Sequence, residues 1–318
     1  MSARAWTCFA AVSVLWGVPY LFIKLAVDEV DPGFVAWSRV ALGALVLAPL
    51  ALRAGALRGL GARRRPLVAY ALVEIVVPFP LIAFGERHIS SSLTAILIAA
   101  VPLTIAVLAL RFDAAERVGG ARLAGLVVGL AGVVALVGLD IAGRPSELIG
   151  AACVFGAVIG YAAGPMVLRL HLGDVDPRGL VTASLAIATV ALAPLGLAGA
   201  PSAMPSATVL ASIAVLGVAC SALAFVLFAM LIQEVGPGRA AVITYVAPLV
   251  AVALGVTLLG ESLGVGAVAG LLLILAGSWL STDGRLPPGA AALVARLGRG
   301  RGGPDGPEPE PATPPAGP

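Results

Sequence analysis

Charged side chains stand inside two apolar stretches of this sequence, where a charge is costly. Glu74 is flanked by Leu72-Val73 and Ile75-Val76. A carboxylate at the centre of a membrane-spanning helix costs about 2.5–3.5 kcal/mol on an insertion scale, so such residues usually face a cavity or a partner. Two interpretations stay open. Glu74 carries a proton or contacts a substrate amine, or neighbouring Ser, Thr or Arg groups satisfy it in a structural role.

Arg39 is the second charge of this kind, in the motif Trp37-Ser38-Arg39. At ~1.5 Å per residue it lies ~8 Å below the outer interface, and Glu74 lies ~12 Å from the inner one. One hypothesis is a buried Arg39–Glu74 pair that lines a cavity. The other is that Arg39 extends its long side chain to water or phosphate at the membrane surface.

Aromatic and hydroxyl side chains complete the candidate site. Trp16 and Tyr161 stand near the middle of predicted helices, whereas membrane aromatics normally gather at headgroup level. They could stack on a planar or cationic substrate, although ordinary helix packing also explains them. Thr244 and Tyr245 offer hydroxyls of the kind that a substrate site uses. The candidate substrate-binding residues are therefore Trp16, Arg39, Glu74, Tyr161, Thr244 and Tyr245.

These residues need a scaffold of helices, and the composition predicts one that lies in lipid. The chain has 318 residues, of which 60% are hydrophobic and only 12% charged, too few charges to cover a soluble domain. A helix needs roughly 20 apolar residues to cross the hydrocarbon core. The pattern predicts an all-α integral membrane protein with ten transmembrane helices, at 5–24, 34–52, 67–85, 91–110, 120–139, 148–168, 179–198, 208–232, 240–259 and 264–281.

The distribution of basic residues predicts the orientation of these helices, because cytoplasmic loops retain Lys and Arg. With the N-terminus inside, sixteen of the twenty basic residues are cytoplasmic and three are external (Lys24, Arg87 and Arg144). We therefore expect a multi-pass protein of the cell inner (plasma) membrane with both termini in the cytoplasm. Residues 283–318, rich in Pro and Gly, predict a disordered cytoplasmic tail. The net charge of +3 is too small to suggest nucleic-acid binding.

An internal repeat at an offset of 145 residues organises the chain. It aligns Trp16 with Tyr161, Asp31-Pro32 with Asp176-Pro177, Ala48-Pro49-Leu50 with Ala193-Pro194-Leu195, and Glu116 with Glu261. The predicted repeats are residues 1–141 and 142–282, with five helices in each. Because five is odd, the second repeat crosses the membrane in the opposite sense, as in many secondary transporters.

Two groups within the repeats predict structural roles. Glu116 and Glu261 each precede a glycine-rich helix, where a carboxylate can satisfy free amides and oppose the helix dipole. The glycines permit close helix approach, within the chain or between two protomers of a homodimer. They are Gly125, Gly129, Gly132, Gly266, Gly270 and Gly277.

The order and spacing of several short motifs resemble the EamA-type branch of the drug/metabolite transporter superfamily. The matching pieces are Trp16-Gly17 with Lys24, Trp37-Ser38-Arg39, Pro102 followed by Glu116-Arg117, and Tyr245-Val246-Ala247-Pro248 leading to Leu259-Gly260-Glu261. The similarity covers residues 5–281 and implies ten helices in two five-helix repeats. Two departures are Ala115-Glu116, where Gly-Glu is usual, and Glu74 inside the third helix. Members of this family are proposed to move amino acids, nucleosides, drugs or other small metabolites, often outward.

We therefore expect a secondary transporter, an exporter of small metabolites, amino-acid-like compounds or drugs that works by alternating access in the lipid bilayer. Proton coupling is left open. The alternatives are an integral-membrane enzyme and a non-transporting scaffold. The sequence holds no His-x-x-Glu-His motif, no Ser-His-Asp set and no Walker-type glycine loop. We expect no enzyme activity, cofactor or metal.

Overall fold

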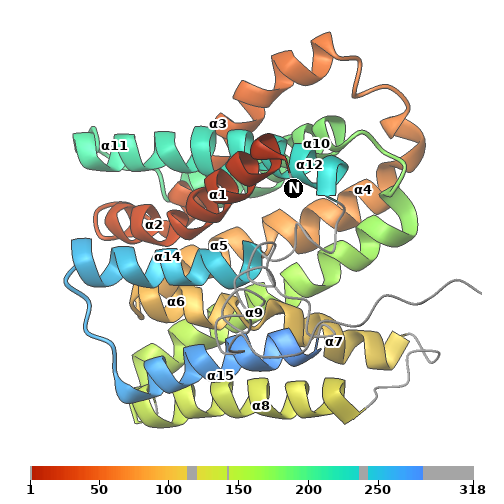
Figure 1. Cartoon of the computed structure of the whole chain (residues 1–318). Helices are drawn as coiled ribbons and strands as arrows, with labels where there is room; N and C mark the ends of the chain where they lie inside the picture. Colours follow the sequence, from red (N-terminus) through yellow and green to blue (C-terminus); the bar gives the residue numbers. More distant parts are fainter. Residues whose placement is uncertain (1, 113–119, 142, 236–242, 282–318) are drawn as a thin grey trace, which may run out of the picture. The chain divides into compact units, whose positions relative to one another are not determined.

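The computed structural model describes residues 2–112, 120–141, 143–235 and 243–281, and within these ranges helices are the only regular elements (Figure 1). The predicted tail, 283–318, and the carboxylate of Glu116 lie outside the described residues. The helices are α1 (Ala3–Gly17), α2 (Pro19–Val27), α3 (Pro32–Arg53), η1 (Leu60–Arg63), α4 (Arg64–Ala71), η2 (Leu72–Val76), α5 (Pro78–Glu86), α6 (Ser91–Ile98), α7 (Val101–Phe112), α8 (Gly120–Leu136), η3 (Val137–Ile141), α9 (Pro145–Val167), η4 (Leu168–Leu172), α10 (Pro177–Ala198), α11 (Ala207–Ala214), η5 (Val215–Leu223), α12 (Ala224–Val235), α14 (Ile243–Leu258) and α15 (Val265–Ser281).

Eight helical runs in the described part of the chain are long and apolar enough to cross a membrane. They are Ala3–Val27, Pro32–Arg53, Leu60–Glu86, Ser91–Leu108, Leu123–Ile141, Pro145–Val167, Pro177–Ala198 and Ala207–Phe228. Each coincides with one of the first eight predicted spans. The last two predicted spans coincide with shorter apolar helices, Ile243–Leu258 and Val265–Leu280, so the count of ten crossings stays a prediction.

The repeated Asp-Pro pairs form two equivalent helix starts. Asp31 precedes α3, and its carboxylate accepts a hydrogen bond from the Gly33 N–H at 2.8 Å. Asp176 precedes α10 and accepts from the Arg178 N–H at 2.9 Å. In both helices proline occupies the first turn, where its missing N–H leaves no partner unsatisfied. The sequence repeat is thus a repeat of local structure at these positions.

A wider helical turn also occurs at equivalent places in the two repeats. The π-helix η2 spans residues 72–76, where the Val77 N–H donates to the Leu72 carbonyl at 3.0 Å. Shifted by 145 residues, this segment falls inside the π-helix η5, residues 215–223. Single π-turns within α-helices are rare and occur frequently at functional sites. Glu74 lies on η2, and Ser221 lies on η5.

The predicted close approach of glycine-rich helices is confirmed, and it lies within one chain. Helix α8 packs along α15 (Figure 1). A Cβ atom added at Gly277 would lie 2.3 Å from the backbone nitrogen of Gly129, and one at Gly132 would lie 2.9 Å from the Gly270 carbonyl oxygen. Because the two helices use these glycines on each other, the glycines no longer support an interface between protomers.

Two carboxylates cap helices of the opposite repeat. Glu261 accepts hydrogen bonds from the N–H groups of Ser91 and Ser92, at 2.7 and 2.9 Å, at the start of α6. Asp140 accepts from Gly266 and Ala267 at the start of α15. The capping role expected of Glu261 is therefore correct, but the helix is not the one that follows it. Tertiary contact brings the α6 amides to Glu261 and leaves α15 to Asp140.

Candidate functional site

Arg39 lies at the interface between the two repeats, which we call the seam. It comes from the middle of α3, and the residue is only 8% exposed. Its Nε donates to the Ser221 hydroxyl of η5 at 3.0 Å, and its guanidinium carbon lies 4.1 Å from the centroid of the Phe79 ring. The burial contradicts the hypothesis that Arg39 reaches the membrane surface. Instead the side chain ties the first repeat to the second.

Ser221 holds Arg39 in a defined position. Its hydroxyl donates to the Leu216 carbonyl at 2.8 Å, five residues back along η5, while its oxygen accepts from Arg39. The hydroxyl thereby acts as donor and acceptor at once, and the residue is fully buried. In the sequence, Ser221 is distinguished only as a serine in an apolar run.

Tyr161 packs against the apolar cluster that contains Val40 and Ile75, the sequence neighbours of Arg39 and Glu74. The tyrosine lies on α9 and is in electrostatic range of both charges. It packs against the apolar clusters that include Val35 and Leu185. Among the described residues no ion pair joins Arg39 to Glu74, so the structure shows a shared neighbour and not the direct pair of the first hypothesis.

Glu74 projects from η2 against α9. A Cβ atom added at Gly164 would overlap the Glu74 Oε2, so the glycine accommodates the carboxylate in this position. Oε2 is buried without a hydrogen-bond partner in the described residues. An unsatisfied carboxylate oxygen in an apolar surrounding is costly. This position fits a group that takes up a proton or a ligand.

Two titratable side chains of the same cluster escaped the sequence analysis. Glu86, the last residue of α5, is fully buried, and neither of its carboxylate oxygens has a described hydrogen-bond partner. Tyr20, on α2, is in electrostatic range of Tyr161, Glu86 and Arg39. The predicted third span ended at residue 85, so Glu86 was counted as a loop residue. A boundary one residue later would have marked it as a second acidic residue in that span.

The other three candidate residues gather away from these charges. Trp16 on α1 stacks near Phe228 and Phe225 of α12, with ring centroids 4.7 and 5.6 Å apart. Tyr245 of α14 belongs to the same apolar cluster, and its hydroxyl donates to the Ser278 carbonyl at 3.2 Å. Its neighbour on α14, Thr244, is partly buried. We call Trp16, Phe225, Phe228 and Tyr245 the aromatic wall. Phe225 also packs against the apolar cluster on which Tyr161 packs.

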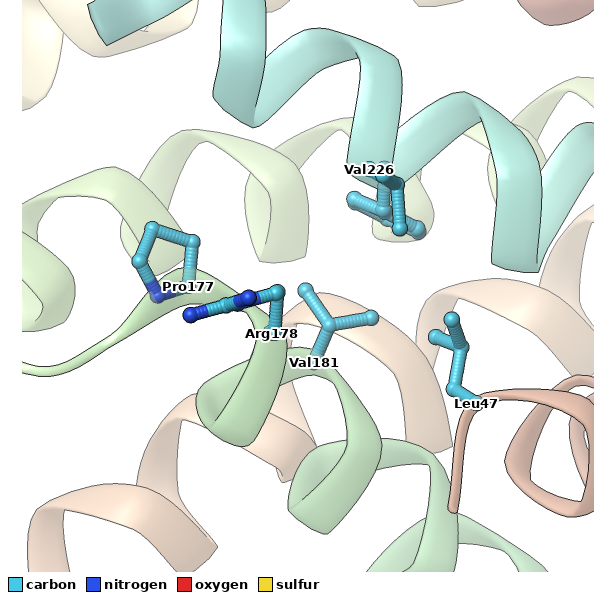
Figure 2. Close-up of a pocket in the computed structure, with 6 residues that line it drawn as sticks. Leu47, Pro177, Arg178, Val181 and Val226 are labelled. Atoms are coloured by element: carbon cyan, nitrogen blue, oxygen red, sulfur yellow. The ribbon is translucent and has the colours of Figure 1, made fainter. Parts of the chain in front are cut away.

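A small hollow follows the same seam (Figure 2). It has a volume of about 10 Å³, close to the room that one water molecule needs. Leu47 lies eight residues beyond Arg39 on α3, or about 12 Å along the helix axis. Figure 2 shows Leu47 facing Val226 of α12 and Val181 of α10 across this space. The hollow is far too small for a metabolite.

Polar contacts join the repeats at both ends of the helices. At one end Arg63 donates to both carboxylate oxygens of Asp174, at 2.8 and 3.0 Å. At the other end the Ser206 N–H donates to Glu29 at 2.6 Å. Hydrogen bonds from the side chain and then the backbone of Ser206 lower the pKa of the Glu29 carboxyl. The seam that contains Arg39 is thus bridged at both ends.

Apolar helices with a buried polar cluster between them define a multi-pass membrane protein, and comparisons with known proteins identify its class. The profile of the EamA-like transporter family matches residues 4–138 and again 148–282. The "Uncharacterized inner membrane transporter YedA" of Escherichia coli K12 is 30% identical over 268 residues, which are 80% of this chain and 82% of that protein. The "Uncharacterized transporter YoaV" of Bacillus subtilis is 22% identical over 86% of this chain and 94% of that protein.

A solved crystal structure shares the fold. It matches with a TM-score of 0.62 and 19% identity, covering 93% of this chain and 99% of that one. The chain belongs to the EamA-like transporter family and is a membrane transporter of the drug/metabolite transporter superfamily. The family and the names of the relatives point to transport and not to an enzyme.

Proposed function

We propose that this protein is a secondary transporter that exports small metabolites, amino-acid-like compounds or drugs from the cell by alternating access. One observation carries the proposal: charged and hydroxyl side chains from both repeats meet in the apolar interior. Arg39 and Glu74 come from the first repeat, and Tyr161 and Ser221 from the second. A site at the interface of two repeats is accessible from either side when the repeats rock against each other.

The chemistry of the cluster favours cargo that is neutral, zwitterionic or amphiphilic. Arg39 offers donors for an anionic or carbonyl group, and Glu74 offers an acceptor for an amine or a proton. The aromatic wall around Trp16 supplies flat apolar surface and attracts cations through its ring faces. With so few charges a polyanion would lack partners. Glu74 is our candidate for proton coupling.

The contacts at the two ends support alternating access as the mechanism. The Arg63–Asp174 pair and the Glu29–Ser206 hydrogen bond each connect residues of different repeats. Both sites are exposed, so each contact is weak and easily broken. Opening one end while the other stays closed would expose the cluster to one side of the membrane at a time.

We further propose ten crossings in two inverted repeats, residues 1–141 and 142–282, in the inner membrane, with both termini and residues 283–318 in the cytoplasm. The test is cysteine labelling with a membrane-impermeant reagent, in a background where Cys8, Cys153 and Cys220 are replaced by serine. Gly61→Cys should react only from the cytoplasmic side, and Ser202→Cys only from the outside. Labelling of both from one side would refute the inverted arrangement.

Transport itself is tested in inverted membrane vesicles. A pooled panel of metabolites and drugs is offered with and without a proton gradient, to the wild type, to Glu74→Gln and to Glu147→Gln. Glu147 is a matched control because its carboxylate is paired with Arg144 at 3.0 Å at the start of α9. Gradient-driven movement that Glu74→Gln loses and Glu147→Gln keeps would support coupling through Glu74. If the wild type moves no compound, the proposed function is wrong.

A further inference from the structure

The outward face of α4 combines basic and apolar side chains that the proposed cargo site does not use. On the inward face of this helix, Leu67 and Tyr70 are buried in the apolar cluster that also contains Leu172 and Leu180. A hollow of about 420 Å³ lies on the other face, a volume in the range of ligand pockets. We call it the α4 hollow, and the described residues that line it are Arg64, Arg65, Val68, Ala69 and Leu72.

The two arginines of the α4 hollow are available to an anion. The residue before them, Arg63, already donates to both carboxylate oxygens of Asp174. Arg64 and Arg65 are exposed, and neither forms an ion pair with another described residue. Both lie in the first turn of α4, where positive charge opposes the helix dipole. The pair therefore does not serve the stability of α4, and its charge is complementary to a negatively charged partner.

The rest of the α4 hollow is apolar and continues along the same face of the helix. Val68 follows Arg64 by one helical turn, and Leu72 follows it by two. Each of these two side chains is 40% exposed. From Arg64 to Leu72 the helix rises about 12 Å. A ligand that fills this space therefore needs a negative charge at one end and an apolar body that extends along the helix.

The position of the hollow along the helix matches the layers of a membrane. Helix α4 belongs to the run Leu60–Glu86, which has 27 residues. At 1.5 Å per residue this run is about 40 Å long, whereas the hydrocarbon core measures about 30 Å. The arginines near its start thus reach the level of the headgroups, and Leu72 reaches the level of the acyl chains. In the proposed orientation this end faces the cytoplasmic leaflet, which carries anionic lipid.

The second repeat lacks such a surface. At the offset of 145 residues, Arg64 and Arg65 correspond to Val209 and Leu210 of α11. That helix starts with an ordinary cap, in which the Val209 N–H donates to the Ser206 hydroxyl oxygen at 3.3 Å. In inverted repeats these two helix starts lie on opposite sides of the membrane. The basic pair is therefore present on one side only, as a ligand from one leaflet requires.

We propose that the α4 hollow is a binding site for one anionic phospholipid. The guanidinium groups of Arg64 and Arg65 donate to the oxygens of its phosphate, as such groups commonly do. One acyl chain lies along Val68 and Leu72 and covers their exposed surface. The site is separate from the proposed cargo site and does not depend on proton coupling. Only the choice of leaflet rests on the proposed orientation.

Native mass spectrometry of the purified protein tests the lipid site. Phosphatidylglycerol and phosphatidylcholine with the same acyl chains are offered to wild type, to Arg64→Gln/Arg65→Gln and to Arg53→Gln/Arg58→Gln. The last variant is the matched control, because it removes two exposed arginines of the same region that do not line the hollow. Wild type should bind phosphatidylglycerol at least about tenfold more tightly than phosphatidylcholine, since each basic residue near the headgroup adds attraction. Arg64→Gln/Arg65→Gln should lose this preference, and the control should change by less than about twofold.

Two further measurements separate the lipid from other partners. Glycerol 3-phosphate carries the phosphate without acyl chains, so at equal concentration it should displace little phosphatidylglycerol. Phosphatidylglycerol should raise the melting temperature of wild type and of Arg64→Lys/Arg65→Lys, because a ligand of the folded state stabilises it. The rise should be absent in Arg64→Gln/Arg65→Gln, whose melting temperature without lipid should match that of the wild type.

Four results would overturn the proposal. They are equal affinity of the wild type for the two lipids, an equal loss in the control and in Arg64→Gln/Arg65→Gln, and displacement of the lipid by glycerol 3-phosphate, which would indicate a site for soluble anions. The fourth is a lipid-free dimer that Arg64→Gln/Arg65→Gln converts to a monomer, because the hollow would then be an interface between two copies of the chain. None of these results bears on transport in vesicles, so the proposed function is tested independently.

Discussion

The two repeats share a framework, but their buried charges differ. Both begin their second helix with an Asp-Pro cap, and both carry a π-helical turn at equivalent positions. Among the described residues, however, the buried charges of Arg39 and Glu86 and the partly buried charge of Glu74 come from the first repeat. At the offset of 145 residues, Arg39, Glu74 and Glu86 correspond to Ser184, Ala219 and Leu231.

The features that the repeats share and the charges in which they differ have different roles. The shared features are local and geometric, and they shape the helices of either repeat. The first repeat supplies the charges of Arg39, Glu74 and Glu86, and the second repeat supplies Ser221, whose hydroxyl oxygen accepts a hydrogen bond from Arg39. We infer that one repeat acts as the charged side of the site and the other as its complement.

The largest effect is expected from removing the arginine of the charged side. Arg39→Met eliminates the hydrogen bond to Ser221, the contact with Phe79 and the positive charge near Glu86. Loss of a buried charge that has several partners is worth about 3 kcal/mol, so transport in vesicles should fall at least about a hundredfold. The repeat-equivalent change, Ser184→Ala, removes a buried hydroxyl without a described partner and should alter transport less than about twofold. Equal losses would mean that the charge asymmetry has no functional meaning.

The next largest effect concerns the glycines that the repeats share. In Gly277→Ala the new Cβ would meet the backbone of α8 at 2.3 Å, and such overpacking costs about 1–3 kcal/mol. Gly132→Ala, its equivalent in α8, should cost a similar or smaller amount, because its closest contact is 2.8 Å. Unfolding of the purified protein in detergent measures both. Gly138→Ala is the control, with nothing within 4 Å, and a drop in its stability equal to that of Gly277→Ala would reject the packing argument.

The crossed caps should have a smaller effect. Glu261→Gln weakens the hydrogen bonds to Ser91 and Ser92 at the start of α6, and Asp140→Asn weakens those to Gly266 and Ala267 at the start of α15. We expect each variant to lose about 1 kcal/mol of unfolding free energy, from the cap and from the helix dipole. Thermal unfolding in detergent provides the comparison. If only one variant is destabilised, the caps do not serve the two repeats equally.

The smallest effect is a pH dependence at the second Asp-Pro cap. Side-chain hydrogen bonds from Arg178, with burial opposing them, lower the pKa of the Asp176 carboxyl. A lowered pKa means that the carboxylate contributes stability above its ordinary pKa of 3.8, and that this contribution is lost as the pH falls through the lower folded value. The melting temperature of the wild type should therefore decrease below about pH 4, and that of Asp176→Asn should decrease less. Parallel curves would show that Asp176 adds no pH-dependent stability.

The sequence predicted the framework well because the framework is local. Hydropathy located the eight candidate spans, and the repeated Asp-Pro pairs became equivalent helix starts. Arg39 and Glu74 were found because a charge in an apolar run is visible in one dimension. Glu86 was missed for the opposite reason, since it stands at the edge of a span where a charge is ordinary.

The partners of these residues could not be predicted. Ser221 lies 182 residues from Arg39, and no periodicity relates them. Glu261 is close to α15 in the sequence, but it caps α6. Its partner there, Ser92, is 169 residues away in the sequence. Such choices depend on which helix faces pack together.

By itself the sequence determined the environment, the helices, the duplication and the resemblance to a family, because hydropathy and caps act over a few residues. The tertiary structure alone decided that Arg39 meets Ser221, that Tyr161 packs on the apolar cluster beside Arg39 and Glu74, and that Glu86 is fully buried. The physical reason is that burial and electrostatic proximity arise only when distant helices pack, and in this protein the packing joins two repeats that are far apart in the chain.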